Sequence, residues 1–221
     1  MNIKAVLFDH DGTIADSEQV HFEMWRDVLY KYGVELSHDE YKSQYAGIPT
    51  TTNAKTIVDN HSLDVEPAAL ASAKSEITNE YLAKQAFPLM RGAFESIRYF
   101  YEQGLIVGIV TGAGSGGVHS TLKNHGLEKY VSVVVSGDDV ENSKPAPDCY
   151  LLAAEKLGLQ PSQCIAIEDT YNGSLSAIRA NMECIGVSSS PSVRHLFSKT
   201  AYKCSDLNNA TQWITQNYLQ K

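Results

Sequence analysis

Apolar residues follow two different patterns along the chain, and the change between them separates two regions. Short apolar runs, typical of buried strands, occur near the start and through the second half, at residues 3–8, 105–110, 131–135, 164–167 and 184–187. From residue 16 to about residue 86, apolar residues recur at helical spacing only. We therefore expect five strands, with a long helical insertion between the first and the second.

Helix signals are clear within the insertion. A first helix ends at Gly33, and Ser37 with Glu40 forms a capping box for a short second one. Residues 50–61 are expected to form a third helix, and Pro67 suits the first turn of a fourth. The insertion is therefore predicted to be all helical.

In the second half, strands alternate with predicted helices, which cover residues 93–103, a segment ending near 125, residues 147–157, 172–180, and 207 to the end. Such alternation is typical of a parallel sheet covered by helices on both faces. Because connections in these sheets are normally short, the helical insertion is expected to be a second domain. We expect an α/β core domain at 1–15 and 87–221, and a helical cap domain at 16–86.

Composition and charge narrow the class of protein. The chain has 221 residues, of which 43% are hydrophobic and 20% are charged, as in an ordinary globular protein. Its formal net charge of -8 argues against nucleic acid or an anionic membrane as a partner. The four cysteines form no CxxC motif, and the first apolar run ends at Asp9, so we expect reduced thiols, no secretion signal and a cytoplasmic location.

Polar side chains follow four of the predicted strands. They are Asp9 and Asp11, Thr111, Lys144, and Glu168 with Asp169. The carboxyl ends of parallel strands meet at one edge of a sheet, where ligands of such sheets bind. Carboxylates there suit a hard cation such as Mg²⁺, and the hydroxyl and the lysine suit phosphate oxygens.

Each of these residues, taken alone, also suits a structural role. Thr111 can cap the following helix, Lys144 can be a solvated loop lysine, and Glu168 with Asp169 can cap a helix that begins near Asn172. The functional interpretation depends on all of them occurring together at the ends of neighbouring strands.

With these motifs, the chain resembles the haloacid dehalogenase-like (HAD) hydrolases. The matching segments are residues 9–13 (DHDGT), 111–112 (TG), 144–147 (KPAP) and 167–173 (IEDTYNG). They resemble most the branch with a helical cap, which contains small-molecule phosphatases and β-phosphoglucomutase. The resemblance implies a Rossmann-like parallel sheet core with an inserted all-helical cap, over essentially the whole chain.

The resemblance also implies roles for individual residues. Asp9 would attack phosphorus and form an aspartyl-phosphate, while Asp11 would protonate the leaving oxygen and later deprotonate water. Thr111, the backbone amide of Gly112 and Lys144 would hold the phosphoryl oxygens. These roles imply a phosphatase acting on a small phosphorylated metabolite.

A magnesium ion is the cofactor that the resemblance implies. Its expected ligands are the Asp9 carboxylate, the backbone carbonyl of Asp11 and Asp169, with Glu168 bound directly or through water. The expected function is therefore magnesium-dependent hydrolysis of a phosphomonoester, such as a sugar phosphate.

Three features depart from the pattern of that branch or of its mutase. His10 occupies a position that is usually apolar, and by strand alternation its side chain should point away from the carboxylates. Thr50 stands where the mutase has an arginine, and residues 113–115 are Ala-Gly-Ser instead of polar and basic residues. His21 matches a mutase histidine but also suits a packing role. The balance favours a phosphatase, with a β-phosphoglucomutase-like phosphotransferase as the alternative.

A dinucleotide-binding protein is a more remote alternative. Residues 112–117 satisfy the GxGxxG pattern between a predicted strand and a helix, and Asp138 or Asp139 follows the next strand. This interpretation leaves Asp9, Asp11 and Lys144 without a role. A non-catalytic binding protein of the same family is a third class.

Overall fold

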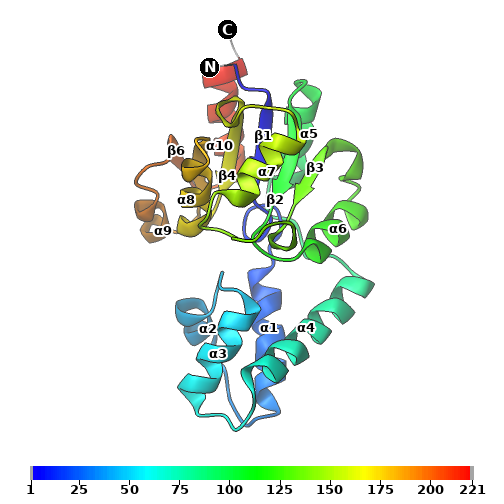
Figure 1. Cartoon of the computed structure of the whole chain (residues 1–221), viewed down its shortest axis with the longest axis vertical. Coiled ribbons are helices and arrows are strands. Elements are labelled where there is room, and N and C mark those ends of the chain that lie inside the picture. Colours follow the sequence, from blue (N-terminus) through cyan, green and yellow to red (C-terminus); the bar gives the residue numbers. More distant parts are fainter. Residues whose placement is uncertain (1, 220–221) are drawn as a thin grey trace. The chain divides into compact units, whose positions relative to one another are not determined.

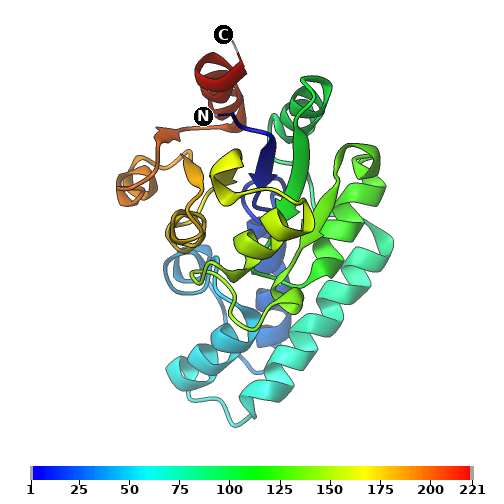
Figure 2. The ribbon, with the colours of Figure 1, turned by 45° about the horizontal axis from the view of Figure 1, so that its top comes forward.

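The core of the protein is one six-stranded parallel sheet in the computed structural model, which describes residues 2–219. The strands are arranged in the order β3-β2-β1-β4-β5-β6 (Figure 1). Their bounds are β1 Ala5–Phe8, β2 Ile106–Val110, β3 Val133–Val135, β4 Cys164–Glu168, β5 Glu183–Val187 and β6 Tyr202–Cys204. The first strand is central, and Figure 2 shows β1 (dark blue) beside β2 (green), although the two are far apart in sequence.

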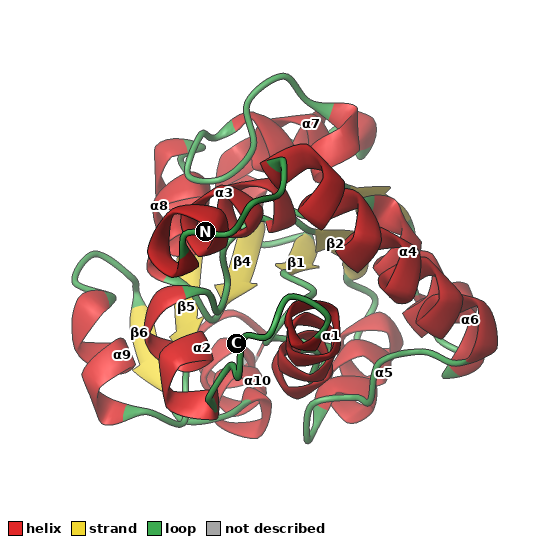
Figure 3. Ribbon diagram, turned by 90° about the horizontal axis from the view of Figure 1, so that it is seen from below, coloured by secondary structure: helices red, strands yellow, loops and turns green. Residues whose placement is uncertain are grey.

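Alternate residues of the strands supply two hydrophobic layers. Val6 and Phe8 face one layer, which also contains residues of α5 (Ala93–Glu102), α6 (Ser115–Asn124) and α10 (Leu207–Ile214). Ala5 and Leu7 face the other, with residues of α7 (Asp148–Lys156) and α8 (Tyr171–Arg179). Figure 3 shows the strands between α7 and α8 on one side and α5 and α10 on the other. Burial on both faces explains why these strands read as continuous apolar runs.

The helical region has its own hydrophobic core. It contains α1 (Glu18–Tyr30), α2 (His38–Gln44), α3 (Thr50–His61) and α4 (Pro67–Lys84). Its buried residues, among them Trp25, Leu29, Tyr45 and Ile57, form a cluster separate from the two layers of the sheet. The chain accordingly divides into two compact units, Met1–Ala15 with Pro88–Lys221, and Asp16–Phe87.

The predicted fold class is confirmed, and the sheet contains one strand more than expected. The additional strand β6 follows a short helix, α9 (Pro191–Leu196), and pairs in parallel with β5 at the edge of the sheet. It has only three residues, with Lys203 exposed at its centre, so it carries no apolar run. The last predicted helix continues after α10 as a π-helical turn, Thr215–Leu219. No helix within residues 2–219 is long and apolar enough to cross a membrane.

Candidate active site

Three neighbouring strands bring the predicted site residues together. Strand β1 pairs with β2 on one side and β4 on the other, so Asp9, Thr111 and Asp169, which follow these strands directly, share one edge of the sheet. Between β1 and β4 the order of the strands reverses, and this is the position where open α/β sheets bind ligands. Asp9 and Thr111 are 6% and 1% exposed.

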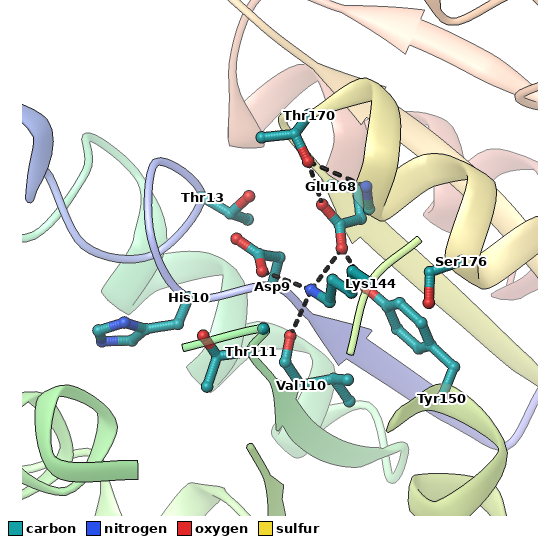
Figure 4. Close-up of polar contacts among 12 residues, drawn as sticks. Asp9, His10, Thr13, Val110, Thr111, Lys144, Tyr150, Glu168, Thr170 and Ser176 are labelled. Atoms are coloured by element: carbon teal, nitrogen blue, oxygen red, sulfur yellow. Dashed lines mark hydrogen bonds and ion pairs between the residues drawn. The ribbon is translucent and has the colours of Figure 1, made fainter. Parts of the chain in front are cut away.

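Lys144 lies at the centre of this group and is not a solvated loop residue. Its ammonium nitrogen is 2.6 Å from Asp9 Oδ1, 2.6 Å from Glu168 Oε1 and 2.8 Å from the Val110 carbonyl oxygen (Figure 4). Burial lowers the pKa of Lys144, but the charges of Asp9 and Glu168 outweigh it and hold this pKa above its ordinary value. The lysine is therefore a fixed positive charge beside the predicted nucleophile.

Tyr150, on α7, belongs to the same network and was not predicted from the sequence. Its hydroxyl donates to Glu168 Oε1 at 2.7 Å, and its ring centroid lies 5.1 Å from the Lys144 nitrogen. Burial raises the pKa of Tyr150 well above its ordinary value, so the hydroxyl stays protonated and remains a donor. In the sequence this tyrosine occupies a position on the buried face of a helix, and only its hydroxyl indicates a second role.

Asp9, Glu168 and Asp169 form a carboxylate cluster. Each offers one oxygen, and these oxygens lie within 4.8 Å of one another. Burial raises the pKa of all three, that of Glu168 to about 7. Lys144 is the only cation that the structure places in ion pairs with this cluster within residues 2–219, so negative charge remains in excess. A set of oxygen donors with uncompensated charge fits a hard divalent cation.

Glycine at two positions lets the backbone approach these carboxylates. At Gly12 φ is +82°, and an added Cβ would lie 2.1 Å from Asp169 Oδ2. At Gly173, in the first turn of α8, an added Cβ would lie 1.9 Å from Glu168 Oε2. The cap of α8 is Thr170, whose hydroxyl accepts from the Gly173 amide at 3.0 Å. Glu168 and Asp169 therefore do not serve as the helix cap.

Asp11 lies beside two groups that contact the same oxygen. Thr111 Oγ1 is 3.4 Å from Asp11 Oδ2, and His10 Nδ1 is 3.2 Å from it. The expectation that His10 points away from the carboxylates is wrong for Asp11. Alternation requires an extended backbone, but here the chain turns at once, and the His10 carbonyl accepts from the amides of Ile14 and Ala15.

The glycine-rich loop before α6 is engaged within the protein. Asp138 Oδ2 accepts from the Ser115 amide at the start of α6, at 3.1 Å. Asp139 accepts from both the amide and the hydroxyl of Ser136. In a dinucleotide-binding protein, Asp138 or Asp139 would have to bind the ribose. Here Asp138 instead accepts from the first turn of α6, the helix end that would bind the phosphates. The Gly112 carbonyl accepts from Ser143 at 3.1 Å, which joins this loop to the segment that carries Lys144.

The fold and this site together define the class of protein. The family model described as haloacid dehalogenase-like hydrolase matches residues 6–187, so the chain belongs to that family. The resemblance is thereby confirmed, and the phosphatases among the relatives confirm the predicted enzyme class, a phosphoric monoester hydrolase.

Particular relatives include fructose-1-phosphate phosphatase YqaB of Escherichia coli, 35% identical over 82% of this chain and 95% of that protein. Among solved structures, CbbY from Rhodobacter sphaeroides in complex with phosphate matches with TM-score 0.79 and 25% identity, over 93% of this chain and 95% of that one. β-Phosphoglucomutase from Clostridium difficile shares the fold with TM-score 0.81 and 21% identity, over 98% of this chain and 97% of that one.

Proposed function

We propose that this protein is a magnesium-dependent phosphatase that hydrolyses a small sugar phosphate through an aspartyl-phosphate on Asp9. The observation that carries the proposal is the position of Lys144, 2.6 Å from Asp9 and paired also with Glu168. The charge of the buried lysine lowers the pKa of Asp9 against the larger effect of burial, and so favours the ionised carboxylate that attacks. The same lysine then offers positive charge where the transferring phosphoryl oxygens would lie.

The other residues fit successive parts of this reaction. Asp11 lies two residues beyond Asp9, with its side chain 28% exposed, and would give a proton to the leaving oxygen and take one from water. The Thr111 hydroxyl and the Gly112 amide would bind phosphoryl oxygens, as hydroxyls and free backbone amides do in such sites. Thr13 Oγ1 donates to Asp169 Oδ1 at 3.2 Å and so fixes one carboxylate of the cluster.

Mg²⁺ would be held by Asp9, the Asp11 carbonyl and Asp169, and it would supply charge neutralisation between the nucleophile and the phosphate. We assign Glu168 a different part from Asp169. Both Lys144 and Tyr150 donate to Glu168 Oε1, so this carboxylate primarily positions the lysine. Any contact of Glu168 with the metal would then use its other oxygen or a bridging water.

A phosphate-release assay on a panel of sugar phosphates tests the proposal. The panel contains fructose 1-phosphate, because a similar protein of Escherichia coli is named for that substrate. We expect phosphate release with Mg²⁺, loss of release in chelator, and no turnover by Asp9→Asn, whose amide is not a nucleophile. Activity unchanged by thorough chelation would contradict the metal assignment, and an active Asp9→Asn would contradict the nucleophile.

The same assay distinguishes hydrolysis from phosphoryl transfer between sugar phosphates. A mutase needs a second group that binds phosphate, whereas Lys74 in the helical unit is buried, with its Nζ 2.9 Å from His21 Nδ1. Glucose 1-phosphate, with a sugar bisphosphate as primer, should yield free phosphate. Faster formation of glucose 6-phosphate would establish the mutase alternative.

A further inference from the structure

His10 is buried between the sheet and α6 and makes two polar contacts. It is 1% exposed, and its Nε2 lies 2.9 Å from the hydroxyl of Thr121, a residue of α6 that is 0% exposed. Its Nδ1 lies 3.2 Å from Asp11 Oδ2. Figure 4 shows the ring pointing away from Lys144. The imidazole therefore joins a helix on one face of the sheet to the predicted acid.

The hydrogen-bonding capacities of these groups assign a direction to the chain of contacts. His10 Nδ1 and Asp11 Oδ2 lie within ion-pair distance, and an ionised carboxylate only accepts, so this contact favours the ring form with its proton on Nδ1. In the neutral ring Nε2 then accepts, and the Thr121 hydroxyl can donate to it. A hydroxyl can also accept, so the carboxylate and not Thr121 favours this tautomer, while Thr121 holds the ring in place through Nε2.

A donor on Oδ2 also orients Asp11 when the carboxyl is protonated. An oxygen that accepts from N–H is the carbonyl oxygen, so the acid proton is directed to Oδ1. The Thr111 hydroxyl donates to the same Oδ2 at 3.4 Å, and this also directs the acid proton to Oδ1. The two contacts restrict rotation of a side chain that is 28% exposed and would otherwise sample several rotamers.

We propose that His10, held by Thr121, is a positioning residue that orients Asp11 for proton transfer to the leaving oxygen. In that step the Asp9–phosphorus bond forms, the bond from phosphorus to the leaving oxygen breaks, and the Asp11 proton moves to that oxygen. The proposal depends on the proposed function, because it assumes that Asp11 is the general acid. It adds a residue at a position where strand alternation predicted no contact with Asp11.

Dependence on the leaving group tests this assignment. An alkyl leaving group needs the proton, whereas p-nitrophenolate leaves readily without it, so mispositioning Asp11 should affect the two substrates unequally. The measured quantity is kcat/KM, which reports the steps through formation of the phospho-enzyme and is independent of its later hydrolysis. We expect His10→Leu to lower kcat/KM at least about tenfold on a sugar phosphate and by less than about threefold on p-nitrophenyl phosphate.

Two further variants separate positioning from packing. His10→Asn keeps an N–H donor near the position of Nδ1 and should recover most of the loss. Thr121→Val removes only the hydroxyl that holds Nε2 of the ring and should show a smaller loss of the same selectivity. Thr211→Val is the matched control, since its hydroxyl donates to Ser96 on another pair of helices, at 2.8 Å, and it should show no selectivity.

The outcomes distinguish failure of this proposal from failure of the proposed function. Asp11→Asn should itself show the leaving-group selectivity, and its absence there would overturn the role of Asp11 and this proposal with it. If Asp11→Asn is selective while His10→Leu and Thr121→Val lose activity equally on both substrates, or lose none, His10 is a structural residue only. Thermal unfolding of each variant shows whether it is folded. If His10→Leu does not fold, Thr121→Val provides the test in its place.

Discussion

At the scale of single residues, the site depends on how Lys144 is satisfied. An ammonium group has three donors, and here they reach Asp9, Glu168 and the Val110 carbonyl oxygen. These three contacts fix the ammonium group in one position. The Tyr150 hydroxyl in turn donates to Glu168 and holds that carboxylate in place. A charge held this way needs no reorganisation when phosphoryl charge develops.

Replacing Lys144 should therefore affect both activity and stability. We expect Lys144→Ala to lower kcat/KM by about 10²- to 10³-fold, the effect of losing a preorganised donor. The variant leaves Asp9 and Glu168 buried without their partner, which should lower the free energy of unfolding by roughly 3 kcal/mol at pH 8. The loss should be smaller at pH 5, where the raised pKa of each carboxyl lets it take up a proton instead.

Steady-state kinetics and denaturant unfolding measure the two effects. Lys123→Ala, at an exposed position on α6, is the matched control and should leave both quantities near the parent values. Near-parent kinetics for Lys144→Ala would show that the lysine contributes only to the fold.

At the scale of elements, the turn after β1 is the most constrained segment of the site. Gly12 combines a positive φ with a close approach to Asp169, whereas Gly104 has φ of +79° and no atom within 4 Å of an added Cβ. Gly104→Ala should therefore cost about 1 kcal/mol, from backbone conformation alone. Gly12→Ala should cost more and should also displace the Asp169 carboxylate.

Metal affinity separates these two variants further. We expect Gly12→Ala to weaken binding of Mg²⁺ at least about tenfold, as displacing a ligand or its support does, while Gly104→Ala leaves it unchanged. Isothermal calorimetry measures the affinity directly. Equal affinities for the two variants would contradict the displacement of a metal ligand by Gly12→Ala.

The predictability of each element follows from its burial. Strands covered on both faces are continuous apolar runs, so β1, β2 and β4 and the residues that follow them could be located from the sequence. The edge strand β6 has no such pattern. The contact between His10 and Asp11 could not be predicted, because it depends on where the backbone leaves the extended conformation. Tyr150 was missed because an apolar helix position does not show where a hydroxyl points.

At the scale of the whole molecule, the carboxylate cluster links stability to pH and metal. The pKa of Glu168 is raised to about 7 in the folded protein, so between its ordinary value and pH 7 the folded state binds more protons than the unfolded state. Stability without metal should therefore fall as pH rises through this window. The raised pKa values of Asp9 and Asp169 act in the same direction.

A divalent cation should reverse this dependence. Metal binding requires the deprotonated carboxylates, so added Mg²⁺ should raise the melting temperature more at pH 7.5 than at pH 5.5. At concentrations of about 100 times the dissociation constant, the gain should reach about 2.7 kcal/mol. Differential scanning calorimetry with Mg²⁺ and with chelator measures it. A gain independent of pH would indicate that the cation binds elsewhere.

The central claim is that Asp9 carries the phosphoryl group, and trapping that group tests it most directly. The protein is mixed with a labelled sugar phosphate and Mg²⁺, quenched in acid within the first turnover, and digested for mass spectrometry. We predict a phosphoryl group on Asp9 in the parent protein and none in Asp9→Asn. Phosphate release with no label on Asp9 at any quench time, or label on another residue, would contradict the account.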